Sequence, residues 1–158
     1  MSVPMTHAHH DHGKCIQNAR LKADEYCRDN ALQLTPVRKR VHEILLGEHR
    51  AMGAYDILET LSEEGLGSQP PAVYRALDFL QQHGFVHKIE RLNAFVACSN
   101  PLSHHTPAFL ICGTCKAVAE ETTTHDVSAL NATAAAAGFD VDRIVVEAVG
   151  TCADCQDA

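Results

Sequence analysis

The fold of this chain is decided by residues 70–98, which read PPAVYRALDFLQQHGFVHKIERLNAFVAC. Two prolines open a predicted helix, because the first helical position loses nothing when its N–H is missing. Val73, Leu77 and Leu80 recur at helical spacing and mark the side expected to be buried. Residues 86–97 then predict a β-hairpin of two apolar strands around a polar turn. Helices followed at once by a hairpin indicate a winged helix-turn-helix domain.

Three more helices are predicted upstream, over residues 16–32, 36–47 and 54–64. The second of them has the clearest start. The Thr35 hydroxyl can cap it, and Pro36 occupies the first helical position. The helix of residues 54–64 and the one that begins at Pro70 would form the helix-turn-helix pair.

Downstream of the hairpin the pattern changes to strand, turn, strand, helix and strand. The predicted elements cover residues 108–111, 117–122, 126–137 and 141–149. The fold class is therefore α+β, with an N-terminal winged helix-turn-helix domain and a small C-terminal α/β domain. The predicted divisions are a disordered His-rich tail (1–14), a DNA-binding domain (15–98), a hinge (99–106) and a C-terminal metal-binding domain (107–158).

The charge of the chain is distributed unevenly. Its net charge of −7 argues against a protein that coats nucleic acid nonspecifically. Residues 1–98 hold 11 Lys and Arg against 12 Asp and Glu, whereas residues 99–158 hold 2 against 8. A polyanion is therefore expected to bind the first half, where cations are locally concentrated.

Targeting signals are not expected in this sequence. The first residues are polar and His-rich, unlike a signal peptide, and the longest apolar stretches are far too short to cross a bilayer. We therefore expect a cytoplasmic protein without a membrane partner. In that compartment the seven cysteines would be thiols or metal ligands rather than disulfides.

The strongest chemical signal is a pair of C-x-x-C motifs, Cys112 with Cys115 and Cys152 with Cys155. Four thiolates are enough to close a tetrahedral zinc site with no open position. Such a site stabilises a fold but does not sense the metal. The alternative is two unrelated pairs, one of them a redox dithiol.

A looser group contains His87, Cys98, either His104 or His105, and Glu120. His87 and Cys98 lie on the two strands of the predicted wing, and the others come from the hinge and the second half. Imidazole, thiolate and carboxylate ligands together suit Zn²⁺, whereas an iron or manganese sensor would use N and O donors. The alternative is a buried strand thiol with solvated histidines.

Candidate DNA contacts gather on the helix-turn-helix. Tyr74 and Arg75 lie in the first turn of the second helix, which in this motif enters the major groove. Arg can donate two hydrogen bonds to guanine. Tyr55 could reach the same groove edge, and phosphate contacts are predicted for Thr35, Arg38, Lys39, Lys88 and Arg91. The alternative for Arg75 is a solvated helix cation.

From about Ile16 to Cys155 the chain resembles the ferric-uptake-regulator family, and within it the zinc-uptake-regulator branch. The matching segments are Leu34–Arg38, Ala54–Leu58, Pro70–Leu80, Gly84–Lys88 and the two cysteine pairs. Their number and order make the resemblance specific. It implies a dimeric repressor that binds palindromic operators when loaded with metal, so that residues 107–158 would form the dimerisation domain.

The resemblance also implies roles for individual residues. Cys112, Cys115, Cys152 and Cys155 match the structural zinc ligands, and His87, Cys98, His105 and Glu120 match the sensing ligands. Tyr55 and Arg75 match base-contacting positions. Three departures from the family pattern stand out: only His104 and His105 remain of a histidine-rich run, residues 143–150 lack histidines, and Ala72 replaces a Thr. The first two disfavour iron or peroxide sensing.

The function expected from the sequence is a zinc-responsive repressor of zinc-uptake genes. It would be a homodimer on double-stranded DNA, with two zinc ions per subunit and no small-molecule substrate. The main alternative is an iron- or peroxide-responsive regulator of the same family. An enzyme is not expected, since the four-cysteine site is closed and no H-E-x-x-H motif occurs. A zinc-storage protein using the tail histidines is the remaining alternative.

Overall fold

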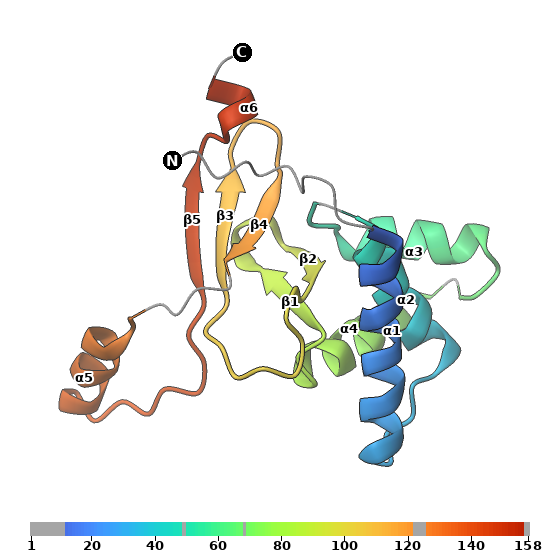
Figure 1. The fold of residues 1–158 in the computed structure, drawn as a ribbon, viewed down its shortest axis with the longest axis horizontal. Coiled ribbons are helices and arrows are strands. Elements are labelled where there is room, and N and C mark those ends of the chain that lie inside the picture. Colours follow the sequence, from blue (N-terminus) through green and yellow to red (C-terminus); the bar gives the residue numbers. More distant parts are fainter. Residues whose placement is uncertain (1–11, 49, 68, 122–125, 157–158) are drawn as a thin grey trace.

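The computed structural model describes residues 12–48, 50–67, 69–121 and 126–156. Its helices are α1 (His12–Asp29), α2 (Pro36–Gly47), α3 (Ala54–Glu63), α4 (Pro70–Gln82), α5 (Ser128–Ala136) and α6 (Ala153–Gln156). Its strands are β1 (Val86–Ile89), β2 (Ala94–Ala97), β3 (Ala108–Cys112), β4 (Val118–Glu121) and β5 (Val146–Gly150), and a 3-10 turn, η1, covers Glu90–Leu92. Helices α1 to α4 form one end of the molecule, and β1 and β2 lie between them and the other three strands (Figure 1).

The helical half is built around α4, which packs against α2 and α3. Its buried side carries Val73, Leu77 and Leu80, as the helical spacing predicts. The cap predicted for α2 is also present, because the Thr35 hydroxyl accepts a hydrogen bond from the Arg38 N–H at 3.4 Å. The predicted helices thus come together in one apolar core.

The wing is the antiparallel pair β1 and β2. Val86 pairs with Ala97 and Ile89 with Ala94, so the predicted strand limits are confirmed. The polar turn between the strands is the 3-10 turn η1, which ends at Asn93 in the left-handed conformation (φ 47°). Asn tolerates this conformation better than most residues.

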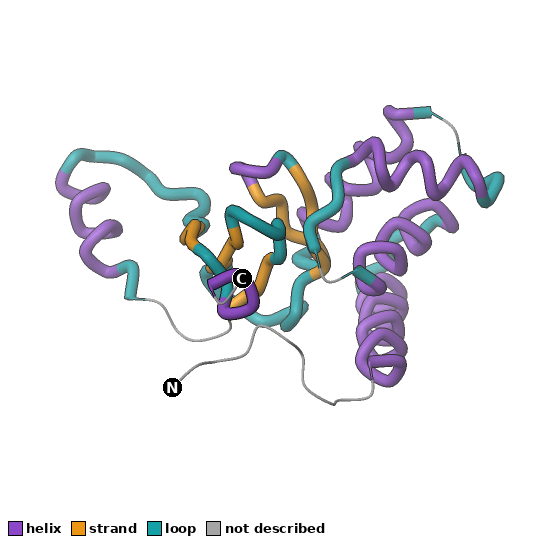
Figure 2. Tube along the Cα trace, turned by 90° about the horizontal axis from the view of Figure 1, so that it is seen from above, coloured by secondary structure: helices purple, strands orange, loops and turns teal. Residues whose placement is uncertain are grey.

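The second half is a three-stranded sheet in the order β4-β3-β5. Strand β4 runs antiparallel to β3, whereas β5 runs parallel to it and is reached by the crossover through α5. With the helical half and the wing, this sheet confirms the predicted α+β class. The view from above places the strands between the four helices and α5, which extends away from the sheet (Figure 2).

The wing belongs to two apolar cores. Ala97 packs against the core of the helices. Ile89 instead joins Phe109 and Ile111 of the sheet in a second core, with Leu92 and Val96 of the wing packed against it. The two halves of the chain are therefore joined by apolar contacts as well as by residues 99–106.

Several predicted boundaries differ from the structure. Helix α1 begins at His12, inside the predicted tail, and ends at Asp29 rather than at residue 32. It stops early because Ala31 is left-handed (φ 53°) and the Leu32 N–H bonds back to the Cys27 carbonyl at 2.7 Å, a helix-ending arrangement. Strand β5 begins five residues later than predicted, and α6 was not predicted.

Parts of two predicted segments cannot be compared with the structure. The tail up to residue 11, with its histidines, and residue 122 of a predicted strand lie outside the described residues. Among the residues that the structure does describe, no helix has the length and apolar character that a bilayer span requires.

His42 is a buried titratable group in the helical core, with 3% of its surface exposed and its ring centroid 5.6 Å from that of Phe85. Burial lowers its pKa from 6.5 to about 4, against the attraction of Asp24. The unfolded chain therefore takes up a proton at higher pH than the folded protein, so this contribution to stability is complete above pH 6.5 and is lost as the pH falls towards 4.

We expect about 2 kcal/mol of the free energy of unfolding to be lost through His42 between pH 7.5 and pH 5. His42→Leu keeps a similar side-chain volume but has no ring nitrogens to protonate. Its free energy of unfolding should therefore fall by about 2 kcal/mol less than that of wild type between pH 7.5 and pH 5. Urea unfolding of both proteins at the two pH values measures this difference. Any metal released at low pH affects both proteins alike, so its effect on stability cancels in the comparison. Equal pH dependence in the two proteins would contradict the prediction.

Candidate metal centres

The two C-x-x-C motifs meet at one end of the sheet. Cys112 ends β3, and Cys115 lies in the turn that follows; Cys152 follows β5, and Cys155 lies in α6. Because β5 runs parallel to β3, with Cys112 opposite Gly150, both strands end on the same side, and both motifs lie at that end of the sheet. The Gly113 N–H donates to the Gly150 carbonyl at 2.8 Å and ties the two turns together.

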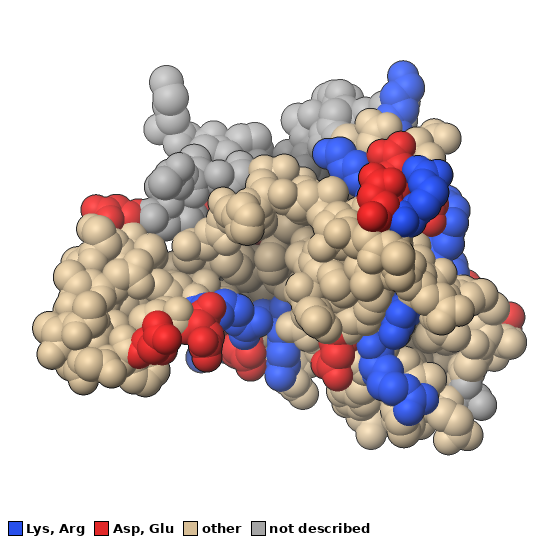
Figure 3. All heavy atoms as spheres, turned by 90° about the horizontal axis from the view of Figure 1, so that it is seen from below, with Lys and Arg blue, Asp and Glu red and all other residues tan. Residues whose placement is uncertain are grey.

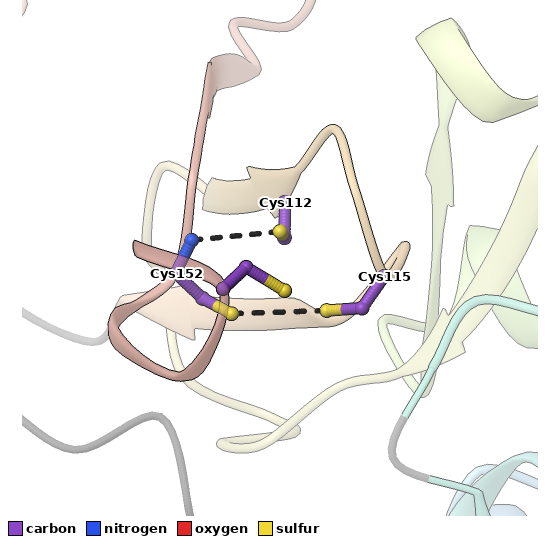
Figure 4. Close-up of side chains that lie close together, drawn as sticks. Cys112, Cys115 and Cys152 are labelled. Carbon is purple, nitrogen blue, oxygen red and sulfur yellow. Dashed lines mark hydrogen bonds between the residues drawn. The ribbon is translucent and has the colours of Figure 1, made fainter. Parts of the chain in front are cut away.

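The geometry of the four cysteines fits a tetrahedral metal ion. Their sulfur atoms all lie within 4.8 Å of one another, and none is in a disulfide. Cys115 Sγ is 3.7 Å from Cys152 Sγ, and the Cys152 N–H donates to Cys112 Sγ at 3.4 Å (Figure 4). Four Zn–S bonds of about 2.3 Å place the sulfurs of a tetrahedron about 3.8 Å apart. The structure therefore brings the predicted cysteines together at zinc-binding distances.

The electrostatics of this cluster call for a cation. Backbone N–H groups of Cys115 and Cys152 lower the pKa of Cys112 to about 5, so this sulfur is a thiolate at neutral pH. The neighbouring sulfur atoms, Cys152 first, and burial together raise the pKa of Cys155 to about 12. A positive ion bound among the sulfurs would offset the charge that the Cys155 thiolate would share with Cys112 and so favour its ionisation.

The second cluster unites four segments of the chain. His87 comes from β1, Cys98 follows β2, His105 lies in the segment between the halves, and Glu120 comes from β4. Their ligand atoms all lie within 4.8 Å of one another. Of the two candidate histidines, His105 is the one that lies in this cluster, whereas His104 is exposed and lies outside it.

Glu120 is the hub of the second cluster. Its Oε1 lies 2.9 Å from His105 Nε2, 3.2 Å from His87 Nε2 and 3.8 Å from Cys98 Sγ. Its Oε2 accepts the Ser99 N–H at 2.7 Å. The other ring nitrogen of His105 lies 2.9 Å from the Ser103 hydroxyl, which orients the ring. Outer contacts of this kind are typical of metal-binding histidines.

The chemistry of the side chains in the second cluster suits a metal ion. His87 Nε2 is buried and, despite its closeness to Glu120, makes no hydrogen bond of acceptable geometry with any described residue. Burial raises the pKa of Glu120, but the imidazoles and the Ser99 N–H outweigh it and lower the pKa to about 2. Burial and Glu120 raise the pKa of Cys98 to about 12. Two imidazoles, a carboxylate and a thiol form a mixed donor set that fits Zn²⁺.

The predicted DNA contacts lie on the helical half. Tyr55 is 71% exposed on α3, and Tyr74 and Arg75 are exposed on α4, on the side away from its buried residues. The Arg38 guanidinium stacks 3.9 Å over the Phe79 ring. Lys39 pairs with Asp24 at 3.2 Å, so a phosphate would have to compete for it. Seen from below, Lys and Arg side chains lie mainly over this half (Figure 3).

One residue that joins the two halves was not predicted from the sequence. Glu147 is the only charged residue of β5, and its carboxylate reaches the tip of the wing. A lone carboxylate in an otherwise apolar strand is the signal that could have pointed to it.

The chain is similar to several known proteins. The profile of the Ferric uptake regulator family matches residues 29–149. The zinc uptake regulation protein of Escherichia coli is 40% identical over 137 residues, which are 85% of this chain and 79% of that protein. A solved zinc uptake regulator complexed with zinc and DNA has a TM-score of 0.84 at 38% identity, covering 90% of this chain and 95% of its own.

Two forms of another protein, XcZur, differ in their likeness to this structure. Its holo form has a TM-score of 0.80 at 39% identity, and its apo form has a TM-score of 0.51 at 38% identity. Both comparisons cover 90% of this chain and 99% of the other. The arrangement of the chain described here thus resembles the holo form far more closely than the apo form.

Proposed function

This chain belongs to the ferric uptake regulator family, and from that membership we propose that it is a zinc-responsive transcriptional repressor. The observation that carries the proposal is the mixed cluster of His87, Cys98, His105 and Glu120. Its soft thiol favours zinc over iron. The names of the relatives agree, since two of them are zinc uptake regulation proteins and one solved relative holds both zinc and DNA.

The mixed cluster would act as the sensor. Its ligands come from the wing, the segment after it and β4, so they can bind one ion only when the two halves adopt one mutual orientation. Zinc would favour this orientation by its greater affinity for it. The contrast between the holo and apo forms of XcZur supports an arrangement that depends on ligand. Operator DNA and zinc would then strengthen each other's binding.

The four-cysteine site would have a different role. All four of its positions are filled by protein sulfur, so it would hold a permanent ion that stabilises the sheet end. We therefore propose two zinc ions per subunit, one structural and one regulatory. With four protein ligands at each site, we propose no zinc-hydrolase activity, because such an enzyme needs an open metal position.

We further propose that a second copy of the chain covers the outer side of residues 107–158. Helix α5 has no buried residue, and large apolar side chains are exposed around it and on the sheet. They are Leu110, Leu130, Phe139, Val146 and Val149. Among the described strands, β5 pairs on one side only and so forms an edge of the sheet, and such edges are normally covered or paired. A two-fold dimer of this kind would present two copies of α4 to a palindromic operator.

The proposal is tested by fluorescence anisotropy of a palindromic operator at buffered free zinc, with Fe²⁺ and Mn²⁺ in parallel. We expect tight binding only above a threshold of zinc, and a steep loss of affinity with salt as phosphate contacts form and release counterions. A response to Fe²⁺ instead of zinc would favour an iron-responsive regulator. Equal occupancy of the operator with and without metal would overturn the proposal.

Arg75→Ala should weaken operator binding about 5- to 150-fold and relax the sequence preference at one base position. The reason is that an exposed Arg at this place on α4 can make a bidentate contact to guanine. Lys39→Ala is the comparison, because a phosphate contact carries no sequence information. It should weaken all sequences alike and reduce the salt slope by about one. Anisotropy with single-base operator variants separates the two, and an unchanged preference in Arg75→Ala would contradict the base contact.

A further inference from the structure

The tip of the wing is held by a carboxylate from the other half of the chain. Glu147 accepts the Glu90 N–H at 2.7 Å with one oxygen and the Arg91 N–H at 3.3 Å with the other. These N–H groups open the 3-10 turn η1, and the first N–H groups of a helical turn have no partner inside it. Glu147 therefore caps the wing tip from across the boundary between the halves.

Glu147 is fixed in place by the sheet. In the strand register, Phe109 of β3 lies opposite Glu147 of β5 on one side and opposite Glu120 of β4 on the other. Residues paired across neighbouring strands point to the same face of a sheet. Glu120, Phe109 and Glu147 thus form one row across the sheet, on the face that meets the wing.

Each member of this row contacts the wing at a different place. Glu120 lies in the mixed cluster, next to His87 of β1. The Phe109 ring lies 5.6 Å from the His87 ring and packs in the same apolar cluster as Ile89. Glu147 holds the turn that follows Ile89. The row of sheet residues therefore contacts β1 of the wing at the mixed cluster and in the middle of the strand, and contacts the turn that follows β1 at the wing tip.

The contact at the wing tip is made by protein groups alone and needs no metal ion. Both of its hydrogen bonds run from backbone N–H to a carboxylate, which makes them stronger than bonds between neutral groups. The neighbouring ion pair of Arg143 with Glu90 spans 3.6 Å between exposed side chains, so it adds little. The tip contact therefore depends chiefly on Glu147.

We propose that Glu147 is a positioning residue of the sensor: a latch, independent of metal, that favours the orientation in which the mixed cluster is assembled. The proposal rests on the function proposed above. If only the assembled fraction binds zinc, the apparent dissociation constant for zinc rises as that fraction falls. Loss of the latch should then raise the zinc level that the repressor needs, while saturating zinc still restores full operator binding.

The test compares wild type with Glu147→Gln and Glu147→Ala. We expect the free zinc at half-maximal operator binding to rise roughly three- to tenfold, more for Ala than for Gln, because the amide keeps one acceptor. Operator affinity at saturating zinc and the metal of the four-cysteine site should not change. Asp140→Asn is the charge-matched control, since this exposed carboxylate makes no hydrogen bond or ion pair with any described residue.

Two readouts separate the latch from the function on which it rests. Zinc affinity measured without DNA, by competition with a chromophoric chelator, should shift by the same factor. Hydrogen exchange at the Glu90 and Arg91 amides should quicken in the chelator-treated variants. An unchanged zinc affinity, or a lower plateau with an unchanged midpoint, would overturn the latch. A wild type whose DNA binding ignores zinc would overturn the function instead, and the chelator competition would still test the latch.

Discussion

Cys98→Ser should move the zinc response of operator binding to far higher free zinc while leaving a folded dimer. Ser fits the same buried position but replaces the thiol of the mixed cluster with a hydroxyl that is a poor zinc ligand. Loss of an outer contact to a metal ligand commonly costs 10- to 100-fold in metal affinity, so loss of the ligand itself should cost more than about 100-fold. Anisotropy across buffered free zinc measures the shift in midpoint.

Cys15→Ser is the matched control for this variant, because Cys15 is an exposed thiol on α1, outside both cysteine-containing clusters. It should titrate like wild type. Metal analysis gives an independent readout: after removal of loosely held ions, both proteins should keep one zinc per subunit, and only Cys98→Ser should fail to regain the second. If Cys98→Ser reached half-maximal operator binding at the same free zinc concentration as wild type, Cys98 would not belong to the sensor.

The parts of this fold that the sequence predicted are those set by local physics. The wing strands match their predicted limits because apolar residues and a polar turn fix a hairpin within twelve residues. Helix α2 begins at Pro36, as predicted, because a capping hydroxyl and a proline act only on their own turn. The spacing of Cys112 and Cys115 likewise defines a turn that points two sulfurs the same way.

What could not be predicted depends on contacts between distant segments. Spacing alone left His104 and His105 equivalent, and the difference arises only when Glu120 of β4 meets the segment before β3. The parallel pairing of β3 with β5, which brings the two cysteine motifs together, is a property of the whole sheet. Glu147 accepts a hydrogen bond from a turn that lies 57 residues earlier in the sequence, and no periodic pattern in the sequence predicts a contact over that separation.

Cys112→Ser or Cys155→Ser should destabilise the C-terminal half and remove the structural zinc. The four cysteines join the end of β3 to α6, a helix of four residues of which none is buried. In sites of this kind the free energy of metal binding becomes free energy of folding. We expect the melting temperature to fall on the order of 10 °C. Differential scanning calorimetry and zinc content per subunit measure both effects.

The Cys112 and Cys155 variants must also differ from Cys98→Ser in kind. Losing the sheet end should weaken the proposed dimer, so operator binding should fail at every zinc level rather than shift its midpoint. Sedimentation should show monomers, and these variants should unfold at temperatures that leave Cys98→Ser folded. If either variant stayed dimeric with undiminished zinc, the cysteines would form two separate pairs, and the stability of this half would have to come from its apolar contacts alone.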